Sequence, residues 1–274
     1  MLKLPFRIHV FTILVVAAAL QAASVRAESS PTGQEIMERA AKRSQSAESR
    51  QDRPDYTYHK QTVTDELDSK GLLKDRQEKQ YEVSVQAGLS QLHLTQLNGK
   101  ELTPAERKKQ DQKEAAELQK MTDRKSDNKG DERENFLTSD MISRYDFTLA
   151  GQKNIDGRPA YEITFKPKSP APPIRQLTDR VLNQVAGTVW IDKQDYEIAR
   201  AEIHLQGEVT VWGGVIGTVT QCNFTLERTR MPDGAWFNRY SNGYLEGRKL
   251  LEPIRYRSLS RSTEFKRREL ASLN

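Results

Sequence analysis

Apolar residues show helical spacing in only a few short stretches of the chain, whereas alternating and β-branched stretches dominate the rest. Within Gln34–Ser46, one stripe is formed by Ile36, Met37, Ala40 and Ala41, with charged residues opposite. This spacing predicts an amphipathic first helix whose apolar stripe packs against the rest of the protein.

Period-two alternation predicts many strands, which follow a polar linker at residues 44–54. In the first part of the chain the predicted strands are Tyr56–Leu67, Leu73–Val85, Gln91–Leu97, Phe147–Gln152 and Ala160–Lys166. In the last third they are Thr188–Asp192, Glu197–Gln206, Val215–Arg228, Ala235–Leu245 and Ile254–Phe265. Turns are predicted at residues 193–195, at residues 231–234 and at Glu246-Gly247. Because short turns join antiparallel neighbours, the last third is predicted to be an antiparallel meander.

A charged helix interrupts the strands. Thr103 and Glu106 form a capping box, and Pro104 suits the first helical position, so a helix is predicted to begin here and to continue to about Met121. Its side chains are mostly charged, which is typical of a solvated surface helix. The charged residues 123–133 that follow predict a mobile connection.

Together these elements indicate an α+β fold with one large curved antiparallel sheet, a half-barrel whose apolar concave face a few helices cover. Further helices are predicted at Glu134–Tyr145 and Arg175–Gln184, where apolar residues recur at helical spacing. Alternation places Ala199, Ala201, Ile203 and Leu205 on one face, with Ile198 on the other. It also places Trp236, Tyr240 and Tyr244 on a common face.

The N-terminus has the features of an export signal. Lys3 and Arg7 precede an apolar run, Val10–Leu20, and Val25-Arg26-Ala27 is a small-x-small cleavage signature before Glu28. The run is short for a membrane span, which disfavours the alternative of an anchor helix. Since no cysteine lies near the cut, the expected product is a periplasmic protein of residues 28–274, a single domain without a lipid anchor.

Composition narrows the possible partners. Removal of the signal takes Lys3, Arg7 and Arg26, so the basic residues fall from 43 to 40 against 38 acidic ones, and the net charge falls from +5 to +2. This balance argues against nucleic-acid binding. Cys222 is the only cysteine, so an internal disulfide is excluded.

Catalytic groups are sparse. The mature chain has three histidines, His59, His93 and His204, which are far apart in sequence and lack metal-ligand spacing. Cys222 alternates with Thr220 and Phe224 and is expected to act as a small buried hydrophobe. Gly213, Gly214 and Gly217 do not match a phosphate loop, and a bulged turn is the better interpretation. We therefore expect no enzyme activity, no metal and no cofactor.

Basic residues gather near the C-terminus: Arg255, Arg257, Arg261, Lys266, Arg267 and Arg268. The three residues Arg255, Arg257 and Arg261 share a parity and are expected to project from one sheet face. Protection of an edge strand by charge is the plainer interpretation. The alternative is attraction to anionic lipid headgroups at a membrane surface or to an acidic partner.

Two hairpins resemble those of a known superfamily. Gly187-Thr188-Val189-Trp190-Ile191-Asp192 followed by Ile198-Ala199-Arg200-Ala201-Glu202 is similar to its V-W-I-D … I-x-R-x-E hairpin. Residues 224–228 and 232–237 are similar to its D-G-x-W hairpin. The chain thereby resembles the outer-membrane lipoprotein-sorting, LolA/LolB-like superfamily, over about residues 146–265. The charged helix and loop near 103–133 look like an insertion in that plan.

This resemblance implies a half-open antiparallel barrel closed by helices. It also implies a hydrophobic cavity that holds acyl chains in transit across the periplasm. Another branch of the superfamily is a periplasmic sensor that regulates an anti-sigma factor. No functional residue of the carriers aligns with this chain, so none is transferred.

Two functions follow. The first is a non-enzymatic periplasmic carrier for a lipid, lipoprotein or other amphipathic ligand, whose predicted cavity residues are Ile203, Leu205, Phe224, Trp236, Tyr240 and Tyr244. The alternative is an envelope interaction or sensor module that docks a protein through the charged helix or a sheet edge. An apolar cavity of roughly 300–1,000 Å³ favours the carrier, and a filled core favours the interaction module.

Overall fold

The computed structural model describes residues 30–45, 55–86, 89–126, 137–211, 217–250 and 252–268. Two units are distinguished, Met1–Pro31 and Thr32–Asn274, and the helices and strands described below belong to the second. The predicted signal, most of the predicted linker and residues 127–133 of the predicted connection lie outside the described residues. Residues 123–126 of that connection are helical, so this part of the prediction is wrong. So do Gly213 and Gly214.

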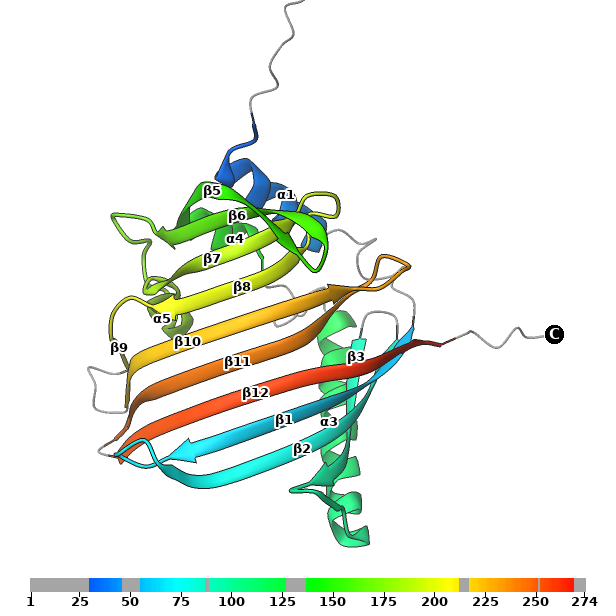
Figure 1. The fold of residues 1–274 in the computed structure, drawn as a ribbon. Helices are drawn as coiled ribbons and strands as arrows, with labels where there is room; N and C mark the ends of the chain where they lie inside the picture. The colour runs from blue at the N-terminus through cyan, green and yellow to red at the C-terminus, as the bar shows by residue number, and fades with distance from the viewer. Residues whose placement is uncertain are drawn as a thin grey trace, which may run out of the picture. The chain divides into compact units, whose positions relative to one another are not determined.

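The second unit is built on one antiparallel sheet of twelve strands (Figure 1). The strands are β1 (Tyr56–Leu67), β2 (Leu73–Gln86), β3 (Leu89–Leu97), β4 (Lys100–Glu101), β5 (Tyr145–Ile155), β6 (Arg158–Pro167), β7 (Val185–Asp192), β8 (Ile198–Leu205), β9 (Val209–Val211), β10 (Gly217–Arg230), β11 (Trp236–Lys249) and β12 (Glu252–Arg267). Their order is β4-β3-β2-β1-β12-β11-β10-β8-β7-β6-β5, with β9 beside β10. The sheet is open, since β4 and β5 form its two ends, and the predicted α+β half-barrel is confirmed.

Four helices are described: α1 (Gly33–Gln45), α3 (Pro104–Ser126), α4 (Ser139–Arg144) and α5 (Leu177–Leu182). Helices α1 and α4 lie against the same face of the sheet, behind β5–β8 in the view of Figure 1. Among the described residues, no helix has the length and apolarity needed to cross a membrane.

The main core lies between helix α1 and the strands β6–β10. The predicted apolar stripe of α1 is fully used, since Ile36, Met37, Ala40 and Ala41 are all buried. They pack with Ile163, Val189, Ile191, Ala201 and Leu226 from the sheet. We call the face that carries these five sheet residues the cavity face. A smaller aromatic cluster of Tyr56, Tyr58, Phe237 and Phe265 lies apart from this core.

The charged helix begins as predicted. The Thr103 amide donates to the Glu106 carboxylate (2.9 Å), and the Glu106 amide donates to Thr103 Oγ1 (3.4 Å), which is the capping box. Its half-buried residues are Arg107, Gln110, Glu114 and Leu118. Because these residues recur at helical spacing, α3 contacts β3 through a mainly polar stripe.

The predicted turn at Glu246-Gly247 is wrong. Both residues lie inside β11, where Glu246 pairs with Arg255 and Gly247 pairs with Ile254. A Cβ atom on Gly247 would lie 2.1 Å from the carbonyl oxygen of Thr218. Glycine is therefore needed here because β10 approaches closely, which sequence alone does not distinguish from a turn.

Two predicted face assignments are also wrong, and β-bulges explain both. In β8, Trp190 pairs with Arg200 and Ile191 with Ile198, so one residue is skipped and Ile198 joins the core with Ala201. In β11, Glu227 pairs with Tyr240 and Arg228 with Asn238, so Arg239 is the extra residue. An extra residue reverses the side chains that follow it, which separates Trp236 from Tyr240 and Tyr244.

The helix predicted at Glu134–Tyr145 is shorter than expected over the part that is described. Helix α4 begins after Thr138, whose Oγ1 accepts a hydrogen bond from the Met141 amide (3.2 Å), and Tyr145 already starts β5. The two short strands β4 and β9 were not predicted, because two or three residues carry no usable alternation.

Candidate functional site

The cavity face changes from apolar to polar across the sheet. One row of directly paired residues runs Leu149, Ile163, Val189, Ala201, Leu226, Ser241, Ser260, Thr62 and Lys79. Directly paired residues in antiparallel strands project from the same face. The hydrogen bond between the hydroxyls of Thr62 and Ser260 (2.8 Å) agrees with this placement. The apolar half of the row lies on β5, β6, β7, β8 and β10, the hydroxyl half lies on β11, β12 and β1, and Lys79 on β2 ends the row.

An apolar cavity of about 110 Å³ lies over the apolar half. It is lined by Met37, Leu137, Met141, Ile142, Tyr145, Phe147, Phe165, Val189, Ile198, Ala201, Ile203, Phe224 and Leu226. The volume is below the roughly 300–1,000 Å³ of ordinary ligand sites. As described, the cavity therefore admits only part of an acyl chain.

The polar groups nearest this cavity are directed away from it. The Tyr145 hydroxyl donates to the carbonyl oxygen of Leu182 (2.8 Å). Arg144, at the end of α4, is buried and donates to Asp140 (2.9 Å) and to Asp179 (2.8 Å). Backbone N–H groups at the start of α5 and the charge of Arg144 lower the pKa of Asp179, which stays a carboxylate. Arg144 thus ties α4 to α5 while its charge stays off the cavity wall.

The six predicted cavity residues do not come together. Ile203 and Phe224 line the cavity, whereas Leu205 pairs with Val185 at the end of β8. Trp236 is buried and its indole N–H donates to Asp195 (2.9 Å). Tyr240 and Tyr244 lie on the opposite face, where the Tyr244 hydroxyl donates to Glu246 (2.8 Å). Met37, Met141 and Phe165 line the cavity but were missed, since each lies on a different element.

The opposite face carries a broad polar hollow of about 640 Å³. Arg200, Glu227, Arg239, Tyr240 and Arg261 are among the residues that line it. Glu227 lies 3.4 Å from the Arg200 guanidinium and 3.2 Å from that of Arg239. This hollow is therefore a mixed-charge surface, with each of these two arginines next to a carboxylate.

The predicted basic residues Arg255, Arg257 and Arg261 of β12 share this opposite face, whereas Arg267, which follows a bulge in β12, pairs with Tyr56 on the cavity face. Several of the basic residues have acidic neighbours. Arg255 donates to Glu246 (2.7 Å), and Arg257 pairs across the strands with Asp65, whose pKa is lowered mainly by a hydrogen bond from Arg76. Further out, Lys266 lies 3.6 Å from Glu264, and Arg267 lies 3.8 Å from Asp233. The amide of Arg268 donates to the carbonyl oxygen of Asp55 (2.8 Å). Local pairing accounts for much of this charge.

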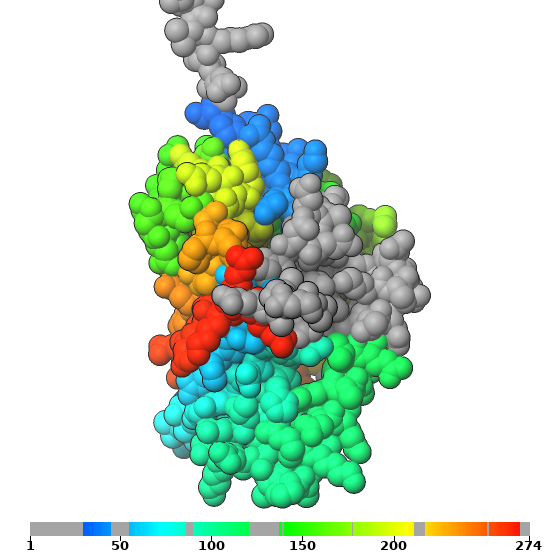
Figure 2. All heavy atoms as spheres, turned by 90° about the vertical axis from the view of Figure 1, so that its right-hand side faces the viewer, coloured from blue at the N-terminus to red at the C-terminus, as the bar shows by residue number. Residues whose placement is uncertain are grey.

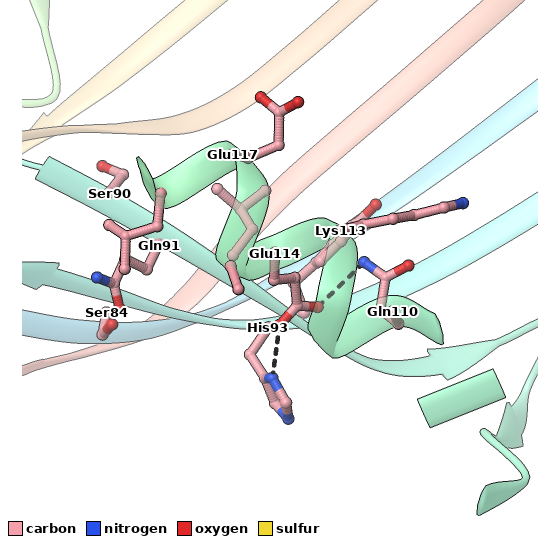
Figure 3. Close-up of a pocket in the computed structure, with 12 residues that line it drawn as sticks. Ser84, Ser90, Gln91, His93, Gln110, Lys113, Glu114 and Glu117 are labelled. Carbon is pink, nitrogen blue, oxygen red and sulfur yellow. Dashed lines mark hydrogen bonds and ion pairs between the residues drawn. The ribbon is translucent and has the colours of Figure 1, made fainter. Parts of the chain in front are cut away.

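A third hollow, of about 380 Å³, lies between α3 and the strands β2 and β3 (Figure 3). Glu114 is its centre: its carboxylate accepts from His93 Nδ1 (2.9 Å), from the Gln110 amide group (3.0 Å) and from the Leu94 backbone amide (3.0 Å). Burial alone would raise the pKa of Glu114, but these hydrogen bonds lower it overall. The helix thereby supplies a partner to the edge of β3, and the two are in contact in the space-filling view as well (Figure 2).

Beside this hollow lie His93, Asp111 and Glu114, with one potential ligand atom of each within 4.8 Å of the others. Sequence spacing did not show the grouping, because it joins a strand to a helix. Nη1 of Arg107 lies 3.0 Å from His93 Nε2 and 4.0 Å from Asp111. A guanidinium beside the cluster disfavours a cation there, so we interpret the cluster as an ion-pair network.

The remaining sequence candidates lie apart. His59 lies 3.8 Å from Glu264, and His204 pairs with Asn223 on the opposite face. Cys222 is half-buried in β10, and burial raises the pKa of its thiol. This thiol is poorly suited to nucleophilic chemistry at neutral pH.

No family model matches the chain, and no curated protein matches it. Several solved structures are similar to it, and they include lipoprotein-sorting and LolA-superfamily proteins. A putative outer membrane lipoprotein-sorting protein domain from Vibrio parahaemolyticus is 10% identical, with 88% of this chain and 94% of that one covered and a TM-score of 0.31. A LolA superfamily protein from Nitrosomonas europaea is 12% identical, with 88% and 96% covered and a TM-score of 0.31.

MucB in complex with MucA is also similar, at 9% identity, with 85% of this chain and 99% of that chain covered and a TM-score of 0.25. These likenesses are remote in sequence and in superposition. The chain's own residues therefore have to indicate its function.

Proposed function

We propose that the protein is a non-enzymatic periplasmic binding protein that holds the apolar chain of an amphipathic ligand in the cavity between α1, α4 and the sheet. The observation that supports this proposal is the cavity lining, which consists of apolar and aromatic side chains. The nearby charged residue Arg144 is bonded to Asp179 and does not line the cavity. Burial of an acyl chain is worth about 0.8 kcal/mol per CH₂ group, so affinity requires apolar surface and no special chemistry.

The cavity wall is suited to adapt to a chain longer than the described volume admits. Met37 and Met141 lie on the two covering helices, and methionine side chains rearrange readily around irregular apolar shapes. Helix α4 has only six residues, so a shift of this one turn and a half would enlarge the site. The sheet beneath is held by the pairing of β8 with β10 and with β7, so we expect it to keep its position.

A cavity-filling variant tests the site. Ala201 is buried and lines the cavity, so Ala201→Leu places new methyl groups where the ligand chain would lie. We expect binding of a fluorescent fatty acid to weaken at least tenfold, while the thermal midpoint stays the same or rises because a gap is filled. The matched control is Glu202→Gln, the next residue of β8 on the opposite face, which should bind as the wild type does.

Two results would contradict the proposal. The first is wild-type protein that neither takes up the fluorescent fatty acid nor carries a co-purified lipid in native mass spectrometry. The second is a folded Ala201→Leu variant with unchanged affinity, which would place any bound chain elsewhere.

Docking of a protein partner is the second candidate, and α3 favours it. This helix runs past the edge of the sheet (Figure 1), and most of its side chains are exposed. Its contact with β3 is polar, so the helix adds little to the apolar core. A crosslinked envelope partner that is lost on deletion of residues 106–120 would support this function, and a partner retained after the deletion would exclude α3 as the docking element.

A further inference from the structure

The polar half of the cavity face contains a lysine, Lys60, that has no carboxylate beside it among the described residues. Lys60 lies on β1, where it pairs with Ser262 of β12 on one side and with Tyr81 of β2 on the other. It is two residues from Thr62, without a bulge between them, so it projects from the cavity face. Ser262 is buried, and Lys60 itself is half-buried. In the part of the chain that the structure describes, no ion pair to its ammonium is found.

A partly buried ammonium group without an anionic neighbour is unfavourable in free energy. Burial lowers the pKa of Lys60, and no acidic group of the described segments offsets that effect. A desolvated charge without a partner costs free energy that an anion beside it would restore. The neighbouring Ser262 hydroxyl is a hydrogen-bond donor that an anion can also use, whereas the hydroxyls of Thr62 and Ser260 are bonded to each other (2.8 Å).

The distance from Lys60 to the cavity matches an amphipathic molecule. Strand β1 is separated from β10, which carries the cavity residues Phe224 and Leu226, by β12 and β11. Three strand spacings amount to about 14 Å. The side chains in between on this face are small, including Ser241, Gly243, Ser258 and Ser260, and small side chains leave room for a chain to lie across the strands.

We infer that the ligand is a single-chain anionic amphiphile, with a carboxylate or phosphate head at Lys60 and its apolar tail running across β12 and β11 into the cavity. This inference rests on the proposed function and adds the ligand's charge and orientation to it. The other strongly charged region, the hollow around Arg200 and Arg239, has Glu227 between its arginines and offers less to an anion.

The test compares ligands that differ only in the head. Dodecanoate, dodecyl phosphate and uncharged dodecanol each displace the neutral probe N-phenyl-1-naphthylamine from the purified protein. We expect at least one of the anionic ligands to bind tenfold or more tightly than dodecanol. The ranking of carboxylate against phosphate then shows which head the site takes.

Variants locate the effect. Lys60→Met should remove the preference for the anionic ligand and leave dodecanol affinity within twofold, whereas Lys60→Arg should keep most of the preference. The matched control is Arg261→Met, which removes one positive charge from the adjacent row on the opposite face and should change neither affinity. Circular dichroism and the thermal midpoint verify that each variant is folded.

The outcomes separate this inference from the proposed function. Equal wild-type affinity for the anionic ligands and dodecanol, or equal weakening of all three by Lys60→Met, overturns the head-group assignment but leaves chain binding in place. An effect of Arg261→Met as large as that of Lys60→Met would assign the preference to overall charge and also overturn it. Failure of all three ligands to displace the probe would overturn the proposed function and this inference with it.

Discussion

Asp192 closes the corner between β7 and β8 and is expected to be a main determinant of stability. Its carboxylate is 1% exposed and accepts two hydrogen bonds from the Arg158 guanidinium (2.7 and 2.8 Å). It accepts two more from the backbone amides of Gln194 (2.9 Å) and Asp195 (2.8 Å), which form the turn. One side chain therefore holds the turn and links it to β6, next to the strands that form the cavity floor.

The magnitude follows from these contacts. Removal of one partner of a buried ion pair costs about 3–5 kcal/mol. The Arg158 side chain is 25% exposed and can be rehydrated when its partner is removed. We therefore expect Asp192→Ala to lower the free energy of unfolding by about 3 kcal/mol, at the low end of that range. Asp192→Asn keeps an acceptor for the turn amides but loses the charged bidentate contact with Arg158. We expect it to lower the free energy of unfolding by about 1.5 kcal/mol. At about 2–4 °C per kcal/mol, Asp192→Ala lowers the thermal midpoint by about 6–12 °C.

The dependence on pH has a definite sign. Burial alone would raise the pKa of Asp192, but the hydrogen bonds from Arg158 and from the turn amides lower it below the ordinary value of 3.8. A carboxylate with a lowered folded-state pKa contributes stability that is present above the unfolded pKa and is lost as pH falls through the folded pKa. The difference between wild type and Asp192→Asn should therefore be full at pH 7 and shrink below about pH 4.

Urea unfolding followed by tryptophan fluorescence at pH 7, 5, 4 and 3 measures both effects. The control is Asp156→Asn, on an exposed hairpin turn, which should change the unfolding free energy by less than about 0.5 kcal/mol. A midpoint for Asp192→Ala within error of that control would refute the reasoning, and so would a wild-type-to-Asp192→Asn difference that stays constant down to pH 3.

Three further outcomes test other parts of the structure. Gly187→Ala would put a Cβ 2.1 Å from the carbonyl oxygen of Glu202, so it should destabilise by about 2 kcal/mol or more in urea unfolding, and an unchanged midpoint would contradict this close approach. Glu114→Ala removes the side-chain partner of the Leu94 amide, so hydrogen exchange at that amide should accelerate while global stability changes by less than about 0.5 kcal/mol; unaltered exchange would show that α3 does not protect this edge. Because burial raises the pKa of the Cys222 thiol, its reaction with Ellman's reagent at pH 7 should be slow until urea unfolds the protein, and rapid full labelling of the native state would be the contrary result.

Local signals in the sequence were sufficient where a few neighbouring residues decide the structure. The Thr103–Glu106 capping box predicts the start of α3, and the structure has both of its hydrogen bonds. The apolar stripe of the first helix predicts its buried face correctly. Long alternating stretches predict most of the strands, and the antiparallel sheet follows from the short turns between them.

Faces were harder to predict, because one extra residue reverses every side chain that follows it. Nothing in the local sequence marks Arg239 as the extra residue of β11, since Trp236, Tyr240 and Tyr244 keep the same parity on both sides of it. The bulge is visible only from the pairing with Glu227 and Arg228 on another strand. For this reason Tyr240 was predicted on the face of Trp236, and two tyrosines were included in a cavity on the other side of the sheet.

The alternation within β12 separates its two faces correctly, but only the basic face was predicted to have a function. One face carries the charged residues Arg255, Arg257 and Arg261. The other carries small uncharged residues, Ser258, Ser260 and Ser262, which in sequence suggest no binding role. The strand pairing shows that the serines are the more relevant residues for the proposed ligand. The arginines have acidic neighbours such as Glu246 and Asp65, whereas the serines lie on the cavity face between Lys60 and the apolar half of the sheet. Larger side chains at these serines would fill the path between the lysine and the cavity. The change from apolar to polar side chains across neighbouring strands is therefore set by the pairing register. The sequence of a single strand does not contain that register.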